Sequence, residues 1–424
     1  MRAAFVVARQ PWYQLMAPVI DAALARGWDV ECWHDYSQPS DGPKGYQFPA
    51  REAVPAFACG RPHVRVYEHR QVLESWLAEK AVDAVISIRT PQLPLPDPSD
   101  RPITVELQHV SDTFVGLSPE EIRHCDVVAL YSRWWQQWGC GYYEAQALIH
   151  DGDGFADALA TRAIDAGMPA LDAAASIDPD EVRRRWGLSP DRPVVALFPF
   201  PQGIGRTAFW PRKIYGESRR WRQLAHVVAE GEYRYLRDVW QGWNDRRVVQ
   251  AIRRFCDAQG AALVVKSRRK TPIPPYLAEI ADVCLYDESW YPASILEVLR
   301  ISQLAISHFS SSVLEAAAMG VPHLCIPFTA EHYGAHSAHD RNAFSRFFHT
   351  EEGGPFRYAG VSTVLEIPDV ITQLPQRTLA SFASDPQARD RYVRQYLSSV
   401  GGAGDRIVSA VERVHMNRTF EAQA

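Results

Sequence analysis

Three adjacent serines, Ser310, Ser311 and Ser312, are the point in this sequence where residue type and spacing first suggest chemistry. They stand between an apolar run typical of a strand, QLAIS, and an alanine-rich run typical of a helix, VLEAAAMG, which ends at Gly320. A turn from strand to helix gathers the free N–H groups of the helix's first turn. Three added hydroxyls predict a phosphate or pyrophosphate site; the alternative is that one serine caps the helix and the others are incidental.

The elements that would position such a turn alternate along the chain. RAAFVVAR indicates a strand, PVIDAALARG a helix ending at Gly27, and WDVECWH a second strand. Further strands are predicted at AVDAVISIR, PITVELQHV, HCDVVALYS, PVVALFPF, AALVVKS, ADVCLYD and VPHLCIPF, with amphipathic runs between several of them and at the C-terminal end. Strands alternating with helices predict parallel, doubly wound sheets covered on both faces.

Length and a break in this alternation divide the chain in two. A chain of 424 residues exceeds one ordinary core, and residues 166–192 carry prolines and a short helix before a new strand. We expect Rossmann-like domains at 1–165 and 193–400, joined by a linker at 166–192, with a C-terminal helix at 401–424 that could pack back on the first domain. The predicted fold class is α/β, with two Rossmann-like doubly wound domains facing across a cleft, where ligands normally bind.

Composition excludes several classes of function. The net charge of −5 gives no basic field for nucleic acid, and the seven scattered cysteines form no C-x-x-C pair typical of zinc or disulfide frameworks. No stretch reaches the roughly 20 apolar residues of a membrane span, and AAFVVA is too short for a signal-peptide core. We expect a cytoplasmic protein. Cations and aromatics in Trp210–Arg222 could add peripheral contact with the inner membrane face; a solvated surface is the alternative.

The segment DESWYPASILEVLRISQLAISHFSSSVLEAAAMGVPHLCIP resembles the donor-site region of GT-B glycosyltransferases. It is most similar to the branch of CDP-glycerol glycerophosphotransferases and capsule-polymer transferases, with UDP-GlcNAc 2-epimerases as more distant relatives. The matching positions are Asp287, Tyr291, Pro292, Ser310, Ser311 and Pro322. Similar interdomain and C-terminal segments extend the resemblance over most of residues 160–415.

The resemblance implies a nucleotide-activated donor in the second domain, with its pyrophosphate on the serine hydroxyls and adjacent amides. By the same comparison Glu315 would bind the donor ribose. Two departures suggest a donor other than CDP-glycerol: His308 replaces the family's aspartate, and Arg268-Arg269 replace its His-Pro. Lys266 and Arg268 still offer cations near the phosphates. His308 could contact a donor phosphate or sugar, with ordinary packing as the alternative.

Transfer from such a donor needs a base for the acceptor hydroxyl, and His109 is the candidate. It closes the predicted strand ITVELQHV, and an imidazole titrates near neutral pH. The resembling family has an acceptor-side His-Gly here, whereas Val110 follows His109 in this chain. The alternative is a strand-end histidine bonded to a loop. No metal or other cofactor is expected, because the D-x-D-like match DGDGF at Asp151–Phe155 is typical of a turn.

These features predict an enzyme that transfers a sugar or polyol-phosphate unit from a nucleotide-activated donor to a cell-surface glycan or lipid-linked acceptor, in polysaccharide biosynthesis of a bacterial envelope. A nucleotide-sugar 2-epimerase of the same fold is one alternative, although its several acid/base carboxylates are not evident at the predicted strand ends. A non-catalytic nucleotide-binding protein is another.

Overall fold

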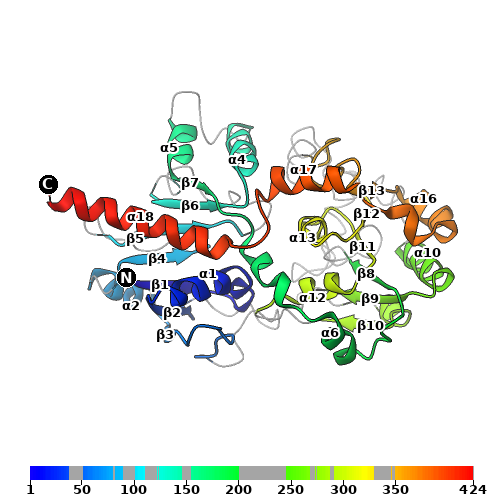
Figure 1. Cartoon of the computed structure of the whole chain (residues 1–424), viewed down its shortest axis with the longest axis horizontal. Helices are drawn as coiled ribbons and strands as arrows, with labels where there is room; N and C mark the ends of the chain where they lie inside the picture. The colour runs from blue at the N-terminus through cyan, green and yellow to red at the C-terminus, as the bar shows by residue number, and fades with distance from the viewer. Residues whose placement is uncertain are drawn as a thin grey trace, which may run out of the picture. The chain divides into compact units, whose positions relative to one another are not determined.

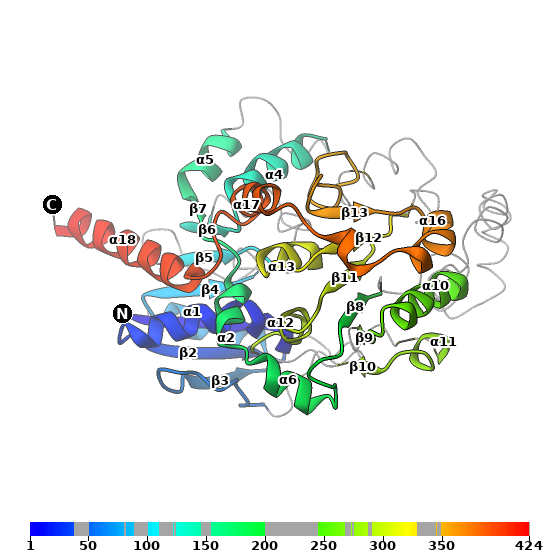
Figure 2. The same cartoon turned by 45° about the vertical axis from the view of Figure 1, so that its right-hand side comes forward.

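The computed structural model of the protein describes residues 1–37, 51–79, 82–88, 101–109, 122, 124–145, 154–199, 245–267, 273, 275–286, 291–328, 345 and 349–423. The chain forms two compact units (Figures 1 and 2). Unit 1 comprises Met1–Ser176, Glu288–Ser294 and Val393–Ala424, and unit 2 comprises Ile177–Asp287 and Ile295–Tyr392. The segment 166–192, predicted as a linker, is divided between the two units at Ser176.

The described residues of unit 1 form a seven-stranded parallel sheet in the order β3-β2-β1-β4-β5-β6-β7. The chain winds outward from β1 to β3, returns to β4 beside β1, and then winds the other way, so the direction of winding reverses between β1 and β4. The strands are β1 (Arg2–Val7), β2 (Asp29–Asp35), β3 (His63–Tyr67), β4 (Ala84–Ser87), β5 (Ile103–Leu107), β6 (Val127–Leu130) and β7 (Ala163–Asp165).

Helices cover this sheet and bring the C-terminal segment to it. In Figure 1 the last helix, α18 (Ala403–Gln423), runs beside α1 (Tyr13–Ala25), and Arg26 bonds to Glu412 across them at 2.6 Å. Close packing at the crossing leaves no room for a side chain at Gly404, where a Cβ would lie 2.4 Å from the Pro18 carbonyl oxygen. The other described helical segments of this unit are η1 (Gln10–Trp12), α2 (Arg70–Ala78), α4 (Arg133–Ala145), α5 (Phe155–Arg162) and η4 (Pro169–Ser176).

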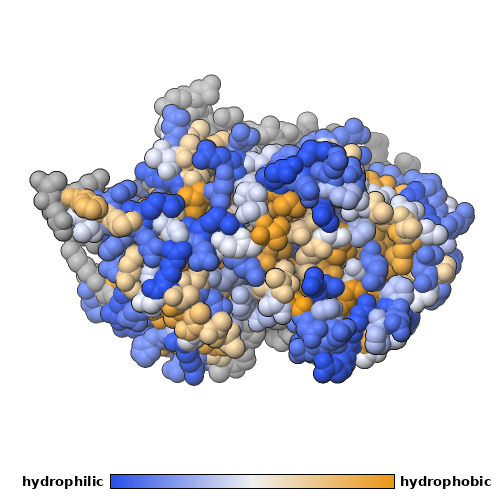
Figure 3. Space-filling view, viewed as in Figure 1, coloured by the Kyte–Doolittle hydropathy of each residue, from blue (hydrophilic) through white to orange (hydrophobic). Residues whose placement is uncertain are grey.

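The far end of α18 carries exposed apolar side chains. Met416 is 51% exposed and Phe420 is 70% exposed, and Figure 3 shows light orange surface along the far part of α18. Met416 and Phe420 are four residues apart and therefore share one face of the helix. None of the helices in the described parts of the chain combines the length and apolar character needed to cross a membrane.

Unit 2 repeats the plan of unit 1 with a second parallel sheet. Its described strands lie in the order β10-β9-β8-β11-β12-β13, so the winding reverses between β8 and β11. The strands are β8 (Val194–Phe198), β9 (Ala262–Lys266), β10 (Val283–Leu285), β11 (Leu304–Ser307), β12 (His323–Cys325) and β13 (Ser362–Val364). β8 and β11 are buried throughout, as expected for central strands of a sheet covered on both faces.

The helix after β11 ends as its sequence predicts. α13 (Ser312–Ala318) is followed by Met319 and then by Gly320, whose φ of +73° is the left-handed conformation that glycine adopts freely. The other helical segments described in or bordering this unit are α6 (Pro179–Arg185), α10 (Asp245–Ala258), α11 (Pro275–Ala278), α12 (Ser294–Arg300), α16 (Ile367–Thr372), η5 (Leu374–Gln376), η6 (Leu379–Phe382) and α17 (Pro386–Tyr396).

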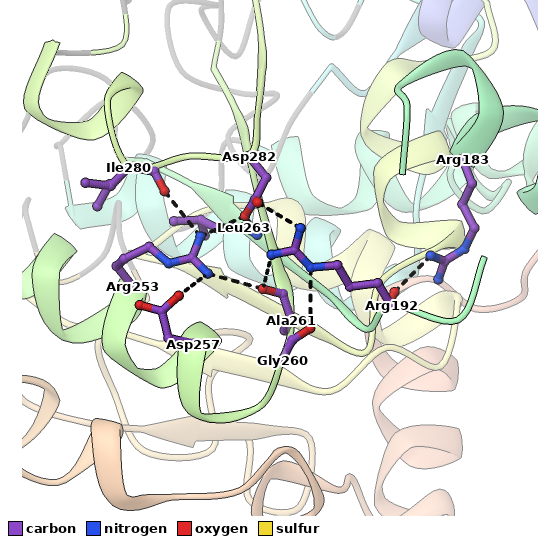
Figure 4. Close-up of polar contacts among 9 residues, drawn as sticks. All are labelled: Arg183, Arg192, Arg253, Asp257, Gly260, Ala261, Leu263, Ile280 and Asp282. Atoms are coloured by element: carbon purple, nitrogen blue, oxygen red, sulfur yellow. Dashed lines mark hydrogen bonds and ion pairs between the residues drawn. The ribbon is translucent and has the colours of Figure 1, made fainter. Parts of the chain in front are cut away.

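Arginine side chains link the amino ends of the unit 2 strands by ion pairs and hydrogen bonds, shown in Figure 4. Asp282, just before β10, accepts from the Leu263 N–H and from Arg253, and it pairs with Arg192 at 2.9 Å. Arg192 also donates to the carbonyl oxygens of Gly260 and Ala261. Because these contacts join segments distant in sequence, they fix the starts of β8, β9 and β10 against one another.

The predicted fold class, α/β with doubly wound Rossmann-like units, is confirmed, and each strand predicted above within the described residues is present. Three further strands, β3, β7 and β13, were not predicted. All three lie at the edges of their sheets, where one side is open and a continuous apolar run is not required.

Candidate functional site

The serines lie at the point of unit 2 where its winding reverses. β11 ends at Ser307, residues 308–312 form a turn, which we call the serine turn, and α13 begins at Ser312. β11 pairs directly with β8 across the reversal. In doubly wound sheets, the carboxyl ends of the strands that flank such a reversal form the usual ligand-binding position. The strand-turn-helix setting predicted for the serines is therefore the one observed.

The three hydroxyls differ in their surroundings. Ser310 Oγ accepts from the Ser312 N–H at 3.3 Å, which matches the role that the capping alternative gives to one serine. Ser311 occupies the N-cap position, but its side chain makes no capping hydrogen bond. Ser312 is 3% exposed, and its Oγ has no hydrogen-bond partner among the described residues. Capping therefore leaves Ser312 without an explanation, and a buried, unsatisfied hydroxyl in a native protein calls for one.

Glu315 lies one turn along α13 from Ser312. Residues three apart share a helix face, so the carboxylate and the Ser312 hydroxyl lie on the same side of α13. Glu315 is 7% exposed and sits in the first turn of the helix, where a negative charge interacts favourably with the helix dipole. The carboxyl group thus places hydrogen-bond acceptor atoms next to the serine turn.

His308, the first residue of the serine turn, is held as a neutral ring. Its Nδ1 donates to the Ile326 carbonyl oxygen at 2.8 Å, because a carbonyl can only accept. Burial lowers the pKa of His308 to about 4, although the bond to Ile326 works in the opposite direction. With its proton on Nδ1, the neutral ring offers Nε2 as an acceptor. This favours contact with a hydroxyl or amino group over pairing with a phosphate.

Behind the turn, a buried histidine joins three strands. His323 on β12 is 1% exposed and bonds through Nε2 to Ser307 Oγ on β11 at 2.9 Å, and through Nδ1 to Ser362 Oγ on β13 at 2.9 Å. Ser307 Oγ in turn donates to the His308 carbonyl oxygen at 2.7 Å. None of the three residues His323, Ser307 and Ser362 was among the predicted site residues. The available signal was a serine and a histidine within apolar runs predicted as buried strands.

The predicted phosphate cations are only partly described. Lys266 is the last residue of β9 and is half-buried, and two strand spacings of about 4.8 Å separate β9 from β11. A lysine side chain can therefore approach a diphosphate held beyond the end of β8. Arg268, Asp287 and the predicted membrane-contact segment Trp210–Arg222 lie outside the described residues.

The predicted base lies on unit 1. His109 is exposed and follows the carboxyl end of β5, two strands from β1 in the sheet. Its ring meets the ring of Trp12 edge-on, with centroids 6.4 Å apart. Trp12 ends η1, the turn after β1, so the two rings meet across the end of β4. Trp12 thus lies beside the reversal of winding in unit 1, which falls between β1 and β4, and His109 lies one strand beyond it at the end of β5.

A second buried pair fixes the turn that carries Trp12. Tyr13, the first residue of α1, donates its hydroxyl to His34 Nε2 at 2.7 Å, because His34 Nδ1–H already donates to the Arg51 carbonyl oxygen at 2.6 Å. Burial lowers the pKa of His34 and raises the pKa of Tyr13 well above its usual value. Both groups therefore stay neutral, and this pair anchors the start of α1 to the end of β2.

The described residues contain no group of three or more histidine, cysteine or acidic side chains placed to hold a metal ion. The segment DGDGF falls largely outside them, apart from Gly154 and Phe155 at the start of α5. The groups near the serine turn are hydroxyls, one lysine, a carboxylate and neutral imidazoles. This set can bind a polar, phosphate-bearing ligand by hydrogen bonds and a single cation.

Two parallel, doubly wound units, each with one reversal of winding, define the GT-B fold. Solved structures with this fold cover nearly the whole chain. The wall teichoic acid polymerase TagF matches at a TM-score of 0.56 and 11% identity, over 100% of this chain and 90% of that one.

A protein from Listeria monocytogenes assigned as a UDP-N-acetylglucosamine 2-epimerase matches at a TM-score of 0.54 and 12% identity, over 98% and 97% of the two chains. The UDP-GlcNAc 2-epimerase from Methanocaldococcus jannaschii matches at 0.51 and 10%, over 97% and 100%. At these identities the comparison establishes the fold. No protein-family model matches the sequence, and a search of curated proteins found no match.

Proposed function

We propose that the protein is a GT-B transferase that moves a sugar or polyol-phosphate unit from a nucleotide-activated donor to a glycan or lipid-linked acceptor. The donor would bind unit 2 at the serine turn, and the acceptor would bind unit 1 near His109. The observation that carries the proposal is the buried, unpartnered hydroxyl of Ser312 in a turn of three serines at the reversal of winding.

The energetics of Ser312 support a ligand at this turn. A buried hydroxyl without a partner costs about 1–3 kcal/mol of folding free energy, which a phosphate oxygen would offset by accepting its proton. Ser311, whose side chain caps nothing, and the amides of the turn supply further donors. Lys266, with Arg268 as a second cation, would neutralise the charge that develops on the leaving nucleotide phosphate.

Glu315 and His308 would recognise the nucleoside. A carboxylate accepts from the two hydroxyls of a ribose, and the neutral ring of His308 accepts from a hydroxyl or an exocyclic amino group. Neither group contributes a positive charge, so we assign both to ribose or base and leave the phosphates to the serines and cations.

The chemistry requires one proton transfer. His109 would take the proton from the acceptor hydroxyl as its oxygen attacks the donor, and the bond to the nucleotide phosphate would break as the new bond forms. The edge contact with Trp12 limits the orientations of the exposed imidazole, which favours a defined direction for this transfer. Among the structures with this fold are two of a TagF variant soaked with CDPG, which supports testing cytidine nucleotides alongside uridine ones.

The test is a nucleotide-binding panel. CMP, CDP, UDP, GDP and ADP are titrated by calorimetry and thermal shift against wild type, Ser312→Ala and the control Ser302→Ala. Ser302 is a serine of the same unit that bonds to the Val298 carbonyl oxygen at the opposite end of β11. We expect one nucleotide family to bind wild type and Ser302→Ala alike, and Ser312→Ala to bind about tenfold more weakly. No binding of any nucleotide at millimolar concentration would contradict the proposal.

A 2-epimerase is the second candidate, since two of the similar structures carry that name. The two functions differ in whether an acceptor is needed. An epimerase changes the sugar of UDP-GlcNAc with no second substrate, whereas a transferase releases the nucleotide in proportion to the acceptor present. Incubation of the bound donor with and without acceptor, followed by chromatography of sugar and nucleotide, separates them.

A further inference from the structure

The hydrogen bonds around His323 have one consistent direction. Ser307 Oγ uses its single proton on the His308 carbonyl oxygen, so it must accept from His323 Nε2–H. A neutral ring protonated at Nε2 has a bare Nδ1, which accepts from the Ser362 hydroxyl. These side-chain hydrogen bonds form a chain, which we call the ladder. It runs from Ser362 through His323 and Ser307 to the His308 carbonyl group at the start of the serine turn.

The register of the strands makes this ladder possible. Ser362 lies directly opposite His323 in the β12–β13 pair. On the other side, Ala305 lies opposite His323, and Ser307 is two residues further along β11, on the same face of the sheet. The ladder thus crosses three adjacent strands on one face and points along β11 toward its carboxyl end.

A fully buried histidine on an inner strand is an expensive choice for packing alone. β11 and β12 are inner strands of the described sheet, and an aliphatic residue at position 323 would bury more apolar surface without a polar group to satisfy. Buried polar networks that are fully satisfied make a structure more specific rather than merely more stable. The specific element at the end of this network is the serine turn.

We propose that His323 is a positioning residue for the serine turn, acting through Ser307 on the His308 carbonyl group and hence on the backbone that carries Ser310–Ser312. The inference rests on the proposed role of that turn as a nucleotide phosphate site. A turn already ordered before the nucleotide arrives loses less conformational entropy on binding, so the ladder strengthens binding without contacting the ligand.

Ser307 and Ser362, which bond to the two ring nitrogens of His323, give a matched comparison. Ser307→Ala removes the link to the turn, whereas Ser362→Ala removes a bond of the same length on the far side and leaves the link intact. His323→Leu removes both bonds, and His323→Gln keeps a donor close to the position of Nε2. Each variant is titrated with UDP and CDP well below its unfolding midpoint, and hydrogen exchange is measured in peptides that cover residues 308–316.

We expect Ser307→Ala and His323→Leu to weaken nucleotide binding about tenfold and to speed exchange in the serine turn, with Ser362→Ala within about twofold of wild type. His323→Gln should recover part of the loss. The proposal is overturned if Ser307→Ala matches Ser362→Ala in both affinity and exchange. If wild type binds none of the five nucleotides of the binding panel, the proposed function fails, and faster exchange of the turn in Ser307→Ala but not Ser362→Ala still decides the positioning role.

Discussion

Two histidines with lowered pKa values, His308 and His323, predict a specific acid sensitivity of unit 2. Burial lowers the pKa of His308 to about 4 and that of His323 to about 3, from the usual 6.5. Below pH 6.5 the unfolded chain binds two protons that the folded chain does not, so stability is fully present above pH 6.5 and is lost as the pH falls toward the folded pKa values. Between pH 6.5 and 5 each histidine accounts for about 2 kcal/mol, at about 1.4 kcal/mol per pH unit.

The two histidines together should therefore cost unit 2 about 4 kcal/mol between pH 7 and pH 5. Other groups also titrate in this range, so the informative quantity is the difference between variants. His323→Gln should remove about half of the loss attributed to the pair, because glutamine does not bind a proton. His63→Gln, which changes an exposed histidine of unit 1, should leave the loss in unit 2 unchanged.

The assay is urea unfolding at pH 7 and pH 5, followed by hydrogen exchange in peptides of β11 and β12. Local exchange reports the transition of unit 2 even if the two units unfold separately. The assignment of this loss to His308 and His323 is refuted if His323→Gln loses as much stability between pH 7 and pH 5 as wild type does. It is also refuted if the exchange-derived loss in wild type stays below about 1 kcal/mol over that interval.

Three further outcomes follow from individual contacts. Ser312→Ala should raise the stability of the unliganded protein by about 1 kcal/mol, because it removes a buried hydroxyl without a partner; a lower melting temperature would show that the hydroxyl is satisfied. Asp282→Asn should cost about 1–3 kcal/mol at pH 7, because it weakens the ties to Arg192 and Arg253, as measured by urea unfolding. Trp12→Leu should lower kcat more than it raises KM in a transfer assay. The control is Trp28→Phe, which should change neither constant; Trp28 is similarly buried and bonds to Glu412.

The Asp282 variant also has a defined dependence on pH. Burial works to raise the pKa of Asp282, but the Leu263 N–H and the guanidinium groups of Arg253 and Arg192 outweigh it and hold the pKa below its usual value. The contribution of this carboxylate is therefore present above its unfolded pKa and is lost as the pH falls. The difference between wild type and Asp282→Asn should accordingly shrink below about pH 4.

The predictable part of the fold is the part that local sequence determines. Inner strands such as β8 and β11 are continuous apolar runs, and Gly27 and Gly320 end their helices with positive φ, so each can be recognised from a few neighbouring residues. The serine turn was predictable for the same reason. It requires only a strand, a run of hydroxyls and a helix in succession.

The unpredicted part depends on strand order and register. Ser307, His323 and Ser362 are far apart in sequence, and they meet because β11, β12 and β13 are adjacent in a particular register. Likewise, Trp12 follows β1 and His109 follows β5, and their contact depends on the order β1-β4-β5 in the sheet. No local pattern encodes these distances. Segments predicted from periodicity alone therefore give the elements of the site but not the contacts between them.

Ion pairs tie the amino ends of several strands, whereas the carboxyl end of β11 carries neutral polar groups. At the amino edges, arginines tie neighbouring strands through carboxylates: Arg253 and Arg192 through Asp282 in unit 2, and Arg101 and Arg418 through Asp126 in unit 1. At the carboxyl end of β11 lie the neutral ring of His308 and the unpartnered hydroxyl of Ser312, and at that of β5 lies the exposed imidazole of His109. Ion pairs suit strand ends that must stay fixed against one another. Neutral donors and acceptors can instead exchange their partners for those of a ligand.

The difference between the amino and carboxyl ends of the unit 2 strands can be tested with one variant at each end. Asp282→Asn acts at the amino ends, so it should lower the unfolding midpoint and leave the dissociation constant for the bound nucleotide unchanged. Ser312→Ala acts at the carboxyl end of β11 and should do the reverse, raising the midpoint while weakening binding. A residue kept for binding at a cost in stability should behave in this way. If both variants moved stability and binding in the same direction, the serine turn would be part of the structural core and the proposed ligand site would lose its main support.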